Sequence, residues 1–289
     1  MRFLAALAAA AVAAIPQLVA KIKVSPLAQP CAAAAGGKWI WVAEYGQPKL
    51  LKIDPRTNKV RSTSVIGGGA CGLGYGAGSM WVEDTSANTV SRVSVTTGKR
   101  IKAIPVGATP YDATFAFGSA WATAHNGGEV DRIDPAKNRV VARVKVLGPT
   151  GVVSAFGSIW AGAFQSVIRI DPATNKIVAT IPDAGGWTAA SADAVWITTP
   201  DNKLLRIDPT TNQVAATITL PGTAGDPDVI DGKVWVPIIL KNDVVVIDPA
   251  TNTIVQTVKT GAGPFVVTQI AGQAWVPSWK GTDIRRFKP

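Results

Sequence analysis

Seven tryptophans recur at an almost constant spacing along the chain. Trp41, Trp81, Trp121, Trp160, Trp196, Trp235 and Trp275 are separated by 40, 40, 39, 36, 39 and 40 residues. A second landmark follows most of them, as IDPRTNKV, IDPAKNRV, IDPATNKI, IDPTTNQV and IDPATNTI. Repeats of about 40 residues have the length of a four-stranded propeller blade. The seven units therefore predict an all-β fold, a seven-bladed β-propeller.

The strands within one unit follow from alternation and turn chemistry. In the third unit we expect strands over residues 111–116, 119–123, 129–133 and 139–146. The Asp-Pro-x-Thr-Asn element joins the third strand to the fourth, because Asp accepts hydrogen bonds from turn amides, Pro fixes φ and Asn tolerates positive φ. The second unit has Gly98 in place of that Asn, which is consistent with a residue of positive φ. The repeated aspartates are thus interpreted as turn residues and the tryptophans as wedges between blades.

The two ends of the chain complement each other. The last unit stops at residues 286–289, which align with residues 169–172, so it lacks an outer strand. Residues 19–24, VAKIKV, have no unit of their own and resemble the outer strand VARVKV at residues 141–146. Pairing of these segments would cover both exposed strand edges. We therefore expect the N-terminal strand to complete the last blade and close the ring.

The first residues are typical of a targeting segment. Arg2 precedes an unbroken Ala-rich apolar run over residues 3–15, which is shorter than the roughly 20 residues that span a bilayer. Small residues before Ile15 favour cleavage after Ala14, so we predict a signal peptide over 1–14 and one propeller domain over 15–289. An uncleaved membrane anchor is the alternative. The mature protein is expected to contain no transmembrane segment and to be periplasmic or secreted.

With these features the chain resembles the YVTN/YncE-like β-propeller repeat family and is also similar to the virginiamycin B lyase-like propellers. The resemblance is carried by the five IDPxTN-type turns and the Gly-x-x-Trp strands, over essentially the whole mature chain. The first group implies an exported binding or scaffold protein, and includes a DNA-binding propeller. The second implies opening of cyclic depsipeptides by a His general base and a metal held near a Glu. The chain has one histidine, so a site needing two imidazoles cannot form.

Polar and aromatic residues gather in the loops that lead into inner strands or join second to third strands. By analogy with other propellers, these loops converge on the channel mouth, the default ligand site. The candidates are Glu44, Tyr45, Glu83, Asp84, Tyr111, Asp112, His125, Trp187, Asp226, Asp228 and Trp279.

Each group of candidates has two interpretations. His125 is either a general base or metal ligand, or a solvated loop residue. The carboxylates either bind a divalent cation or are solvated, and no calcium-loop spacing is present. Trp187 and Trp279 do not belong to the series of seven regularly spaced tryptophans, so they form either a stacking surface or local packing.

Two further features concern the ring as a whole. Cys31 and Cys71 each lie ten residues before a repeat Trp, on adjacent blades, and form either a disulfide closing a loop of 40 residues or buried free thiols. The formal net charge is +10, and basic residues concentrate on the outer strands of blades seven, one, two and three. This basic crescent either attracts an anionic polymer or surface, or provides solubility and protects strand edges.

The sequence therefore predicts an exported, non-enzymatic binding or scaffold propeller, monomeric and without a cofactor. It would bind a small molecule, peptide or protein at the channel mouth. The alternative is a lyase- or hydrolase-like enzyme that uses His125 and a nearby carboxylate, with a divalent cation. Single-stranded DNA binding is a third interpretation, drawn from the resemblance.

Overall fold

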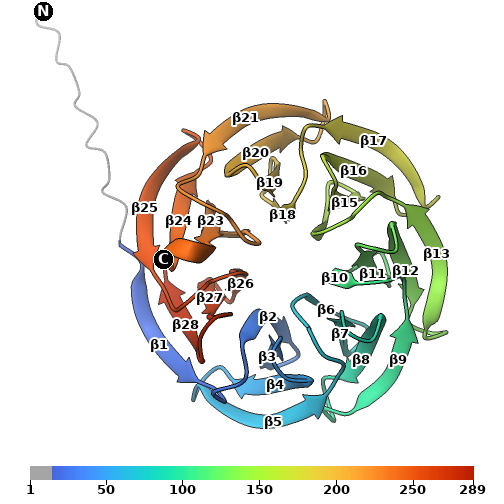
Figure 1. Cartoon of the computed structure of the whole chain (residues 1–289), viewed down its shortest axis with the longest axis vertical. Coiled ribbons are helices and arrows are strands. Elements are labelled where there is room, and N and C mark those ends of the chain that lie inside the picture. Colours follow the sequence, from blue (N-terminus) through green and yellow to red (C-terminus); the bar gives the residue numbers. More distant parts are fainter. Residues whose placement is uncertain (1–14) are drawn as a thin grey trace, which may run out of the picture.

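The computed structural model describes residues 15–289 and shows seven four-stranded antiparallel sheets around a central channel (Figure 1). The predicted seven-bladed, all-β propeller is confirmed. The predicted signal peptide, residues 1–14, lies outside the described residues. Across residues 15–289, no helix has both the length and the apolar character needed to cross a membrane.

Each blade runs from an inner strand at the channel to an outer strand at the rim. Blades 1 and 2 consist of β2 (Pro30–Gly36), β3 (Trp39–Glu44), β4 (Lys49–Asp54) and β5 (Lys59–Val65), and of β6 (Leu73–Gly76), β7 (Ser79–Asp84), β8 (Thr89–Ser94) and β9 (Arg100–Pro105). Blades 3 and 4 consist of β10 (Pro110–Ala116), β11 (Ser119–Ala124), β12 (Glu129–Asp134) and β13 (Arg139–Lys145), and of β14 (Val152–Ala155), β15 (Ser158–Ala163), β16 (Ser166–Asp171) and β17 (Lys176–Pro182). Blade 5 consists of β18 (Trp187–Ala190), β19 (Val195–Thr199), β20 (Lys203–Asp208) and β21 (Gln213–Thr219).

The last two blades complete the ring. Blade 6 consists of β22 (Asp228–Ile230), β23 (Lys233–Ile238), β24 (Asp243–Asp248) and β25 (Thr253–Lys259), with a short 3-10 helix η1 (Ile239–Lys241) between its second and third strands. Blade 7 consists of β26 (Thr268–Ile270), β27 (Gln273–Pro277), β28 (Asp283–Lys288) and β1 (Gln17–Lys23). The strands predicted for the third unit agree with β10 to β13 to within one residue.

The N-terminal strand closes the ring as the sequence predicted. β1 pairs antiparallel with β28, with Gln17 opposite Lys288 and Ile22 opposite Ile284. The amide of Val24 then donates a hydrogen bond to the carbonyl of Thr282 at 3.0 Å. β1 therefore supplies the outer strand of the last blade, and β1 and β28 lie side by side (Figure 1).

The seven repeat tryptophans are the largest buried side chains, each at most 1% exposed. Trp41 packs against Met80 and Val82 of the next blade, and Trp121 against Val152 and Ile159 of the next. This confirms the tryptophans as wedges between blades. Burial of each indole stabilises the fold by a few kcal/mol, at about 25 cal/mol per Å² of buried apolar area.

An arginine opposite the tryptophan fastens most blades to the next one. Arg169 lies in register with Trp160 and its guanidinium stacks on the indole at 4.9 Å. The same group donates to the carbonyl of Pro209 at 2.7 Å and to Asn212 Oδ1 at 3.0 Å, both in the Asp-Pro turn of the next blade. We call the stacking on the indole together with the bond to the Pro carbonyl the arginine clasp; it is formed by Arg92, Arg132, Arg169, Arg206 and Arg286. All of these except Arg206 also donate to the Asn Oδ1 of that turn.

Two seams between blades lack the clasp, and both lack the turn that would receive it. Between blades 1 and 2 the position is Lys52, which donates instead to the carbonyl of Val95. Blade 2 is the unit whose turn has lost both Pro and Asn. Between blades 6 and 7 the position is Val246, and blade 7 has chain ends where the turn would be. Clasp and turn are therefore present or absent together.

The Asp-Pro turns have the predicted geometry. Asp171 Oδ1 accepts a hydrogen bond from the amide of Ala173 at 2.9 Å, and Asn175 has a φ of 57°. Gly98, at the corresponding position of blade 2, has a φ of 71°. Hydrogen bonds to the side chain of Thr174 and to the amide of Ala173 hold the pKa of Asp171 below its usual value. These aspartates are turn residues, as the sequence predicted.

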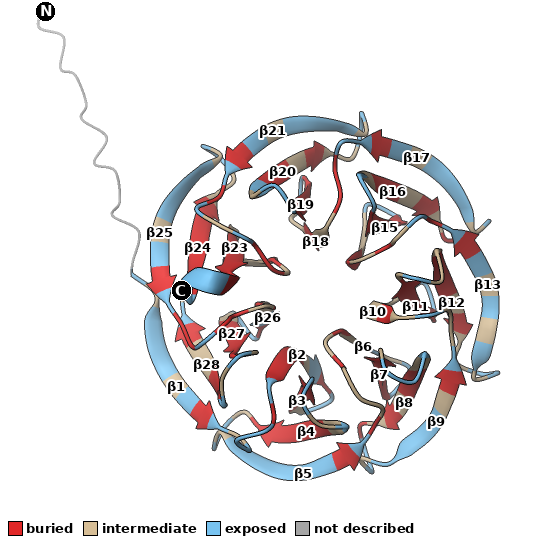
Figure 2. Cartoon of the chain, in the orientation of Figure 1, coloured by how far each residue is buried: buried red, intermediate tan, exposed pale blue. Residues whose placement is uncertain are grey.

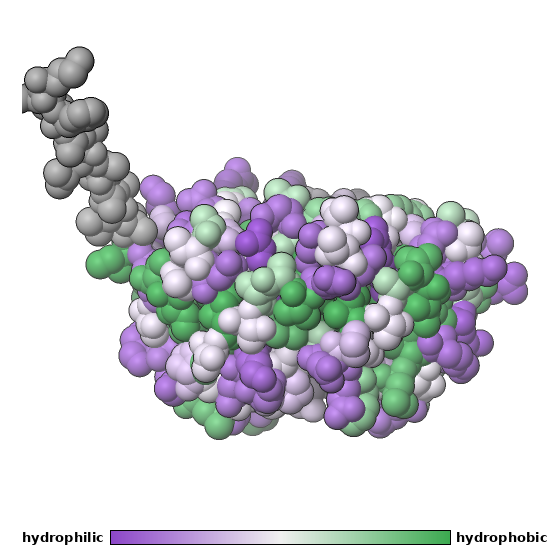
Figure 3. Space-filling model, turned by 90° about the horizontal axis from the view of Figure 1, so that it is seen from above, coloured by the Kyte–Doolittle hydropathy of each residue, from purple (hydrophilic) through white to green (hydrophobic). Residues whose placement is uncertain are grey.

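The rim is the least buried part of the molecule (Figure 2). The outer strands carry half-exposed aliphatic side chains in mid-strand, and Figure 3 shows them as a hydrophobic band between polar edges. The inner strands range from three residues, in β22 and β26, to seven, in β2 and β10. Gly74 of β6 lies against the backbone of Thr114 and Phe115 in the inner strand of the next blade.

Candidate functional site

The channel mouth is formed by two sets of loops. Within an antiparallel blade, the loop before the inner strand and the loop between the second and third strands leave from the same end. Tyr45, Thr85, His125 and Trp279 come from the second set of loops, and Phe265 lies just before an inner strand. The predicted aromatic candidates therefore share one face of the ring.

Five aromatic rings follow one another around this mouth. Tyr45 contacts Trp279 edge to face, with ring centres 5.7 Å apart and planes at 88°. Trp279 lies 5.6 Å from Phe265 at 47°, and Phe265 lies 5.0 Å from Trp187 at 82°. Trp187 lies 6.2 Å from Tyr111 at 39°. We call Tyr45, Trp279, Phe265, Trp187 and Tyr111 the aromatic arc.

The aromatic arc surrounds a hollow of about 220 Å³, the mouth pocket. Besides the five rings, its lining consists of Gly69, Cys71, Glu83 and Thr85. The volume is below the range of about 300–1,000 Å³ for drug-sized ligands. The pocket thus fits a compact group, and its walls are almost entirely apolar.

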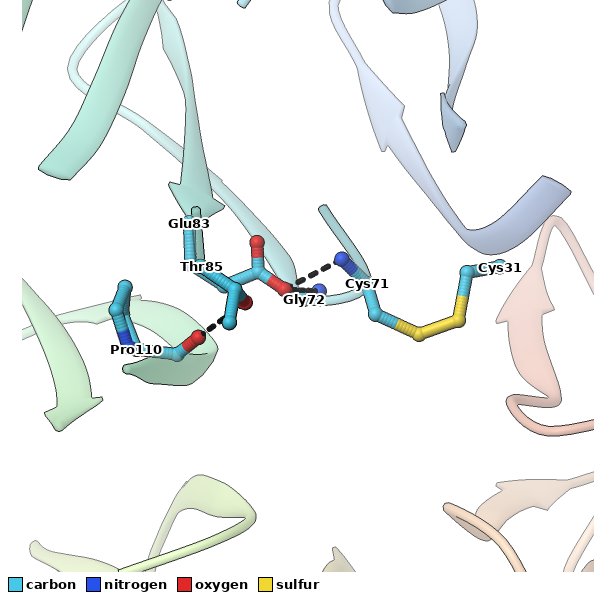
Figure 4. The surroundings of a disulfide bond; sticks show 6 residues. All are labelled: Cys31, Cys71, Gly72, Glu83, Thr85 and Pro110. Atoms are coloured by element: carbon cyan, nitrogen blue, oxygen red, sulfur yellow. Dashed lines mark hydrogen bonds between the residues drawn. A yellow bond between two sulfur atoms is a disulfide. The ribbon is translucent and has the colours of Figure 1, made fainter. Parts of the chain in front are cut away.

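A disulfide and a buried carboxyl group form one side of the mouth pocket (Figure 4). Cys31 and Cys71 are bonded, with Cα atoms 5.0 Å apart, and so link the inner ends of blades 1 and 2. Glu83 is fully buried, and its Oε1 accepts hydrogen bonds from the amides of Cys71 and Gly72. Its Oε2 has no hydrogen-bond partner among the described residues. Burial raises the pKa of Glu83 well above its usual value.

Three more carboxyl groups line the channel, a hollow of about 290 Å³. Asp112 accepts hydrogen bonds from the amides of Ala113 and Val152, both at 2.8 Å, and burial raises its pKa to about 6. Asp228 accepts from the amide of Gln269 in the next blade at 2.6 Å, and burial raises its pKa as well.

Asp226 is the least satisfied of the three channel carboxyl groups. Its Oδ1 is buried without a hydrogen-bond partner among the described residues. Burial, followed by the charges of Asp112 and Asp228, raises the pKa of Asp226 well above its usual value. The channel therefore concentrates three carboxyl groups whose burial favours their neutral forms.

Two of the predicted candidates, Asp84 and Glu44, border neither the mouth pocket nor the channel hollow. Asp84 is buried in blade 2, where Oδ1 accepts from the amide of Gly67 at 2.7 Å and Oδ2 accepts from Ser91 at 2.6 Å. Glu44 is buried and borders a separate hollow beside Lys49 and Val60. These carboxyl groups are neither solvated nor placed to bind a mouth ligand. Both are buried at the end of the second strand of their blade.

His125 lies at the edge of the aromatic arc. Its ring stacks on Tyr111 with centres 4.7 Å apart, and its Nδ1 lies 3.2 Å from the carbonyl oxygen of Pro149. It also borders a second hollow of about 600 Å³, which includes Phe164, Asp183 and Asp201. Asp201 is already paired with Lys203 at 2.6 Å. His125 thus separates the compact mouth pocket from a larger and more open groove.

Metal ligation finds no support in the site. Within residues 15–289, no group of three or more His, Cys, Asp or Glu side chains is placed to hold an ion. The Glu83, Asp112 and Asp228 carboxylates are occupied by backbone amides. These contacts hold blades and loops together.

The outer strands of the basic crescent, β1, β5, β9 and β13, are neighbours around the rim (Figure 1). Part of their charge is neutralised within the blades: Lys21 pairs with Asp283 at 3.1 Å, and Lys145 with Glu129 at 2.6 Å. Lys59 of β5 and Lys102 of β9 are exposed, as is Lys99 directly before β9. The crescent is therefore a real but partly compensated positive surface.

Phe265 is the ring of the aromatic arc that the sequence interpretation missed. It lies ten residues before Trp275, as Cys31, Cys71 and Tyr111 lie ten before their own tryptophans. Extending the cysteine position to every repeat would have found Phe265.

Comparison with known proteins identifies the fold and nothing narrower. No family model and no curated protein matches the chain. A streptogramin B lyase structure, a virginiamycin B lyase-like propeller, matches with a TM-score of 0.80 and 18% identity, over 93% of this chain and 96% of that one. Hydrazine synthase of Kuenenia stuttgartiensis matches with a TM-score of 0.79 and 16% identity, over 92% and 97%. The WD40 propeller domain of Doa1 matches with a TM-score of 0.79 and 11% identity, over 94% and 97%.

Proposed function

We propose that the protein is an exported binding propeller that holds a compact apolar or aromatic group of its ligand in the mouth pocket. The observation that carries the proposal is the aromatic arc. Five rings from four blades border one hollow. Two of them, Trp187 and Trp279, are not among the seven tryptophans that serve as blade wedges, so packing between blades does not account for them. Export is supported by the apolar N-terminal run and by the disulfide, which is typical of oxidising compartments.

The proposal is tested by screening the full mature chain for compounds that raise its unfolding temperature, across sugars, aromatic rings, amines, lactones, cyclic peptides and oligonucleotides. A ligand bound only by the folded state raises that temperature by mass action. The hit is then titrated by calorimetry into Trp187→Ala and into Phe117→Ala. Phe117 is a matched control because it is a half-exposed aromatic in a turn on the opposite face.

We expect Trp187→Ala to weaken binding by roughly tenfold or more, since stacking contacts contribute about 1–3 kcal/mol, and Phe117→Ala to leave it unchanged. Equal affinity in both variants would place the ligand elsewhere and refute the mouth pocket as the site.

The alternative is a lyase- or hydrolase-like activity through His125 and a nearby carboxylate. It is favoured by the position of His125 on the 600 Å³ groove that also contains Asp183 and Asp201. Replacing His125 by Ala distinguishes the two: turnover of a cyclic depsipeptide or lactone that disappears in this variant supports the enzyme. Turnover that is absent from the parent chain, or unchanged by the substitution, removes it.

A further inference from the structure

The ring planes in the mouth pocket stand at steep angles to one another. Two of the four contacts in the aromatic arc are close to perpendicular, at 88° and 82°, and the other two are tilted at 47° and 39°. A flat sugar or base stacks on one face or between two parallel faces. Rings set at steep angles instead contact a rounded group from several sides at once, which is the geometry of an aromatic cage.

The charges around the mouth all have one sign. The mouth pocket contains Glu83, and the channel beneath it contains Asp112, Asp226 and Asp228. No Lys or Arg is among the residues that line either hollow. The chain as a whole has a formal net charge of +10, so this acidic channel runs against the overall charge. An anionic group would meet only carboxyl groups there, whereas a bound cation would favour their ionised form and so gain a counter-charge.

The few polar atoms in the pocket decide which kind of cation fits. A primary ammonium donates three hydrogen bonds and needs acceptors for them. The hydroxyl of Thr85 donates to the carbonyl of Pro110 at 2.6 Å, so its oxygen is left as an acceptor for at most one N–H group of such a ligand. Glu83 Oε1 accepts from two amides, which leaves Oε2 as the one unpartnered carboxyl oxygen in the pocket wall. A metal ion would lack ligands for the same reason. A cation with no N–H groups needs none of these acceptors.

We therefore propose that the mouth pocket binds a quaternary ammonium group, with the aromatic arc as its cage and the carboxyl groups of Glu83 and the channel as counter-charge. This inference rests on the proposed function and narrows its ligand to one chemical class. The remainder of such a ligand would leave the cage past His125, since Tyr111, on which His125 stacks, belongs to the mouth pocket and His125 borders the larger groove.

The test compares choline with 3,3-dimethylbutan-1-ol, its neutral isostere, in calorimetric titrations of the full mature chain. The two molecules have the same shape and differ in charge. Cation–π contacts strengthen when the cation is desolvated, so we expect choline to bind at least about tenfold more tightly. A variant series at Tyr45 supplies the second readout, because this residue is exposed and its replacement leaves the buried core intact.

Tyr45→Phe keeps the aromatic face and Tyr45→Leu removes it at similar apolar volume. We expect the Phe variant to retain choline affinity and the Leu variant to lose roughly threefold or more, with isostere binding unchanged in both. Equal affinity for choline and isostere would overturn the quaternary ammonium inference while the proposed function stands. Absence of any choline binding would overturn it too, and the broad ligand screen then decides the proposed function separately.

Discussion

Removing one arginine clasp measures how strongly neighbouring blades hold each other. Arg169 is suited to this because it makes every contact of the clasp: it stacks on Trp160 and donates to Pro209 and Asn212 of the next blade. Replacement by Met keeps an apolar stem over the indole and removes only the guanidinium. The exposed Arg139→Met, at the start of the outer strand β13, is the matched control.

The magnitude follows from the contacts. Hydrogen bonds to a charged group contribute about 1.5–3 kcal/mol when removed from a buried site, and stacking of a guanidinium on an indole contributes about 0.5–1 kcal/mol at exposed sites. Arg169 is only half-buried, so water replaces part of the lost contacts. We expect Arg169→Met to lower the free energy of unfolding by about 2–3 kcal/mol. At about 2–4 °C per kcal/mol, the value for domains of 150–250 residues, this corresponds to a fall of roughly 4–12 °C in the unfolding midpoint.

Differential scanning calorimetry and urea unfolding, followed by near-UV circular dichroism, provide the measurement. Arg139→Met should stay within about 0.5 kcal/mol of the parent, as is usual for exposed positions. A double-mutant cycle with Asn212→Gly isolates the contact between blades, since Gly tolerates the φ of 55° at this position. Arg169→Met that is no more destabilising than the control, or a cycle with no coupling, would show that the clasp does not hold the seam.

Three further predictions concern stability. Replacing Cys31 and Cys71 by Ser, or reducing their bond, should cost about 4 kcal/mol of unfolding free energy, because the bond closes a 40-residue loop; unaltered urea midpoints would contradict this. Burial raises the pKa of Asp131 to about 6, so its stabilising contribution is complete below pH 4 and is lost as pH rises through 6. Asp131→Asn should therefore shrink the stability lost between pH 4 and pH 7 by about 3 kcal/mol, and an unchanged pH profile would refute the assignment. Deleting residues 15–24 should expose the edge of β28 and cause self-association, and a monomer by sedimentation would argue against that role for β1.

The sequence predicted the features that repeat. The tryptophan spacing predicted seven blades, the Asp-Pro-x-Thr-Asn motif predicted a turn with positive φ, and the likeness of residues 19–24 to an outer strand predicted the closing pair. Each of these has the same physical role in every blade, so a local pattern was enough. The same local pattern also contained Arg169 before Ile170-Asp171-Pro172, but its role was hidden because its acceptors lie 40 or more residues away, in the next blade.

The site was harder to predict because it is built from what does not repeat. Glu83 and Asp84 follow each other at the end of β7 and look alike in sequence, yet only Glu83 borders the mouth pocket. A strand directs successive side chains to opposite faces, and the loops around each face decide what those carboxyl groups meet. Both are buried because of loops before the inner strands, whose paths sequence patterns do not specify.

The pairing of β1 with β28 also sets the order of events during synthesis. β1 is synthesised before every other strand of the described residues, and its only partner in the sheet, β28, is synthesised after all of them. Until β28 has left the ribosome, β1 has no strand to pair with, and the blades between them form an open arc. The ring closes only after β28 is made, so a chain truncated before β28 lacks the strand that β1 pairs with.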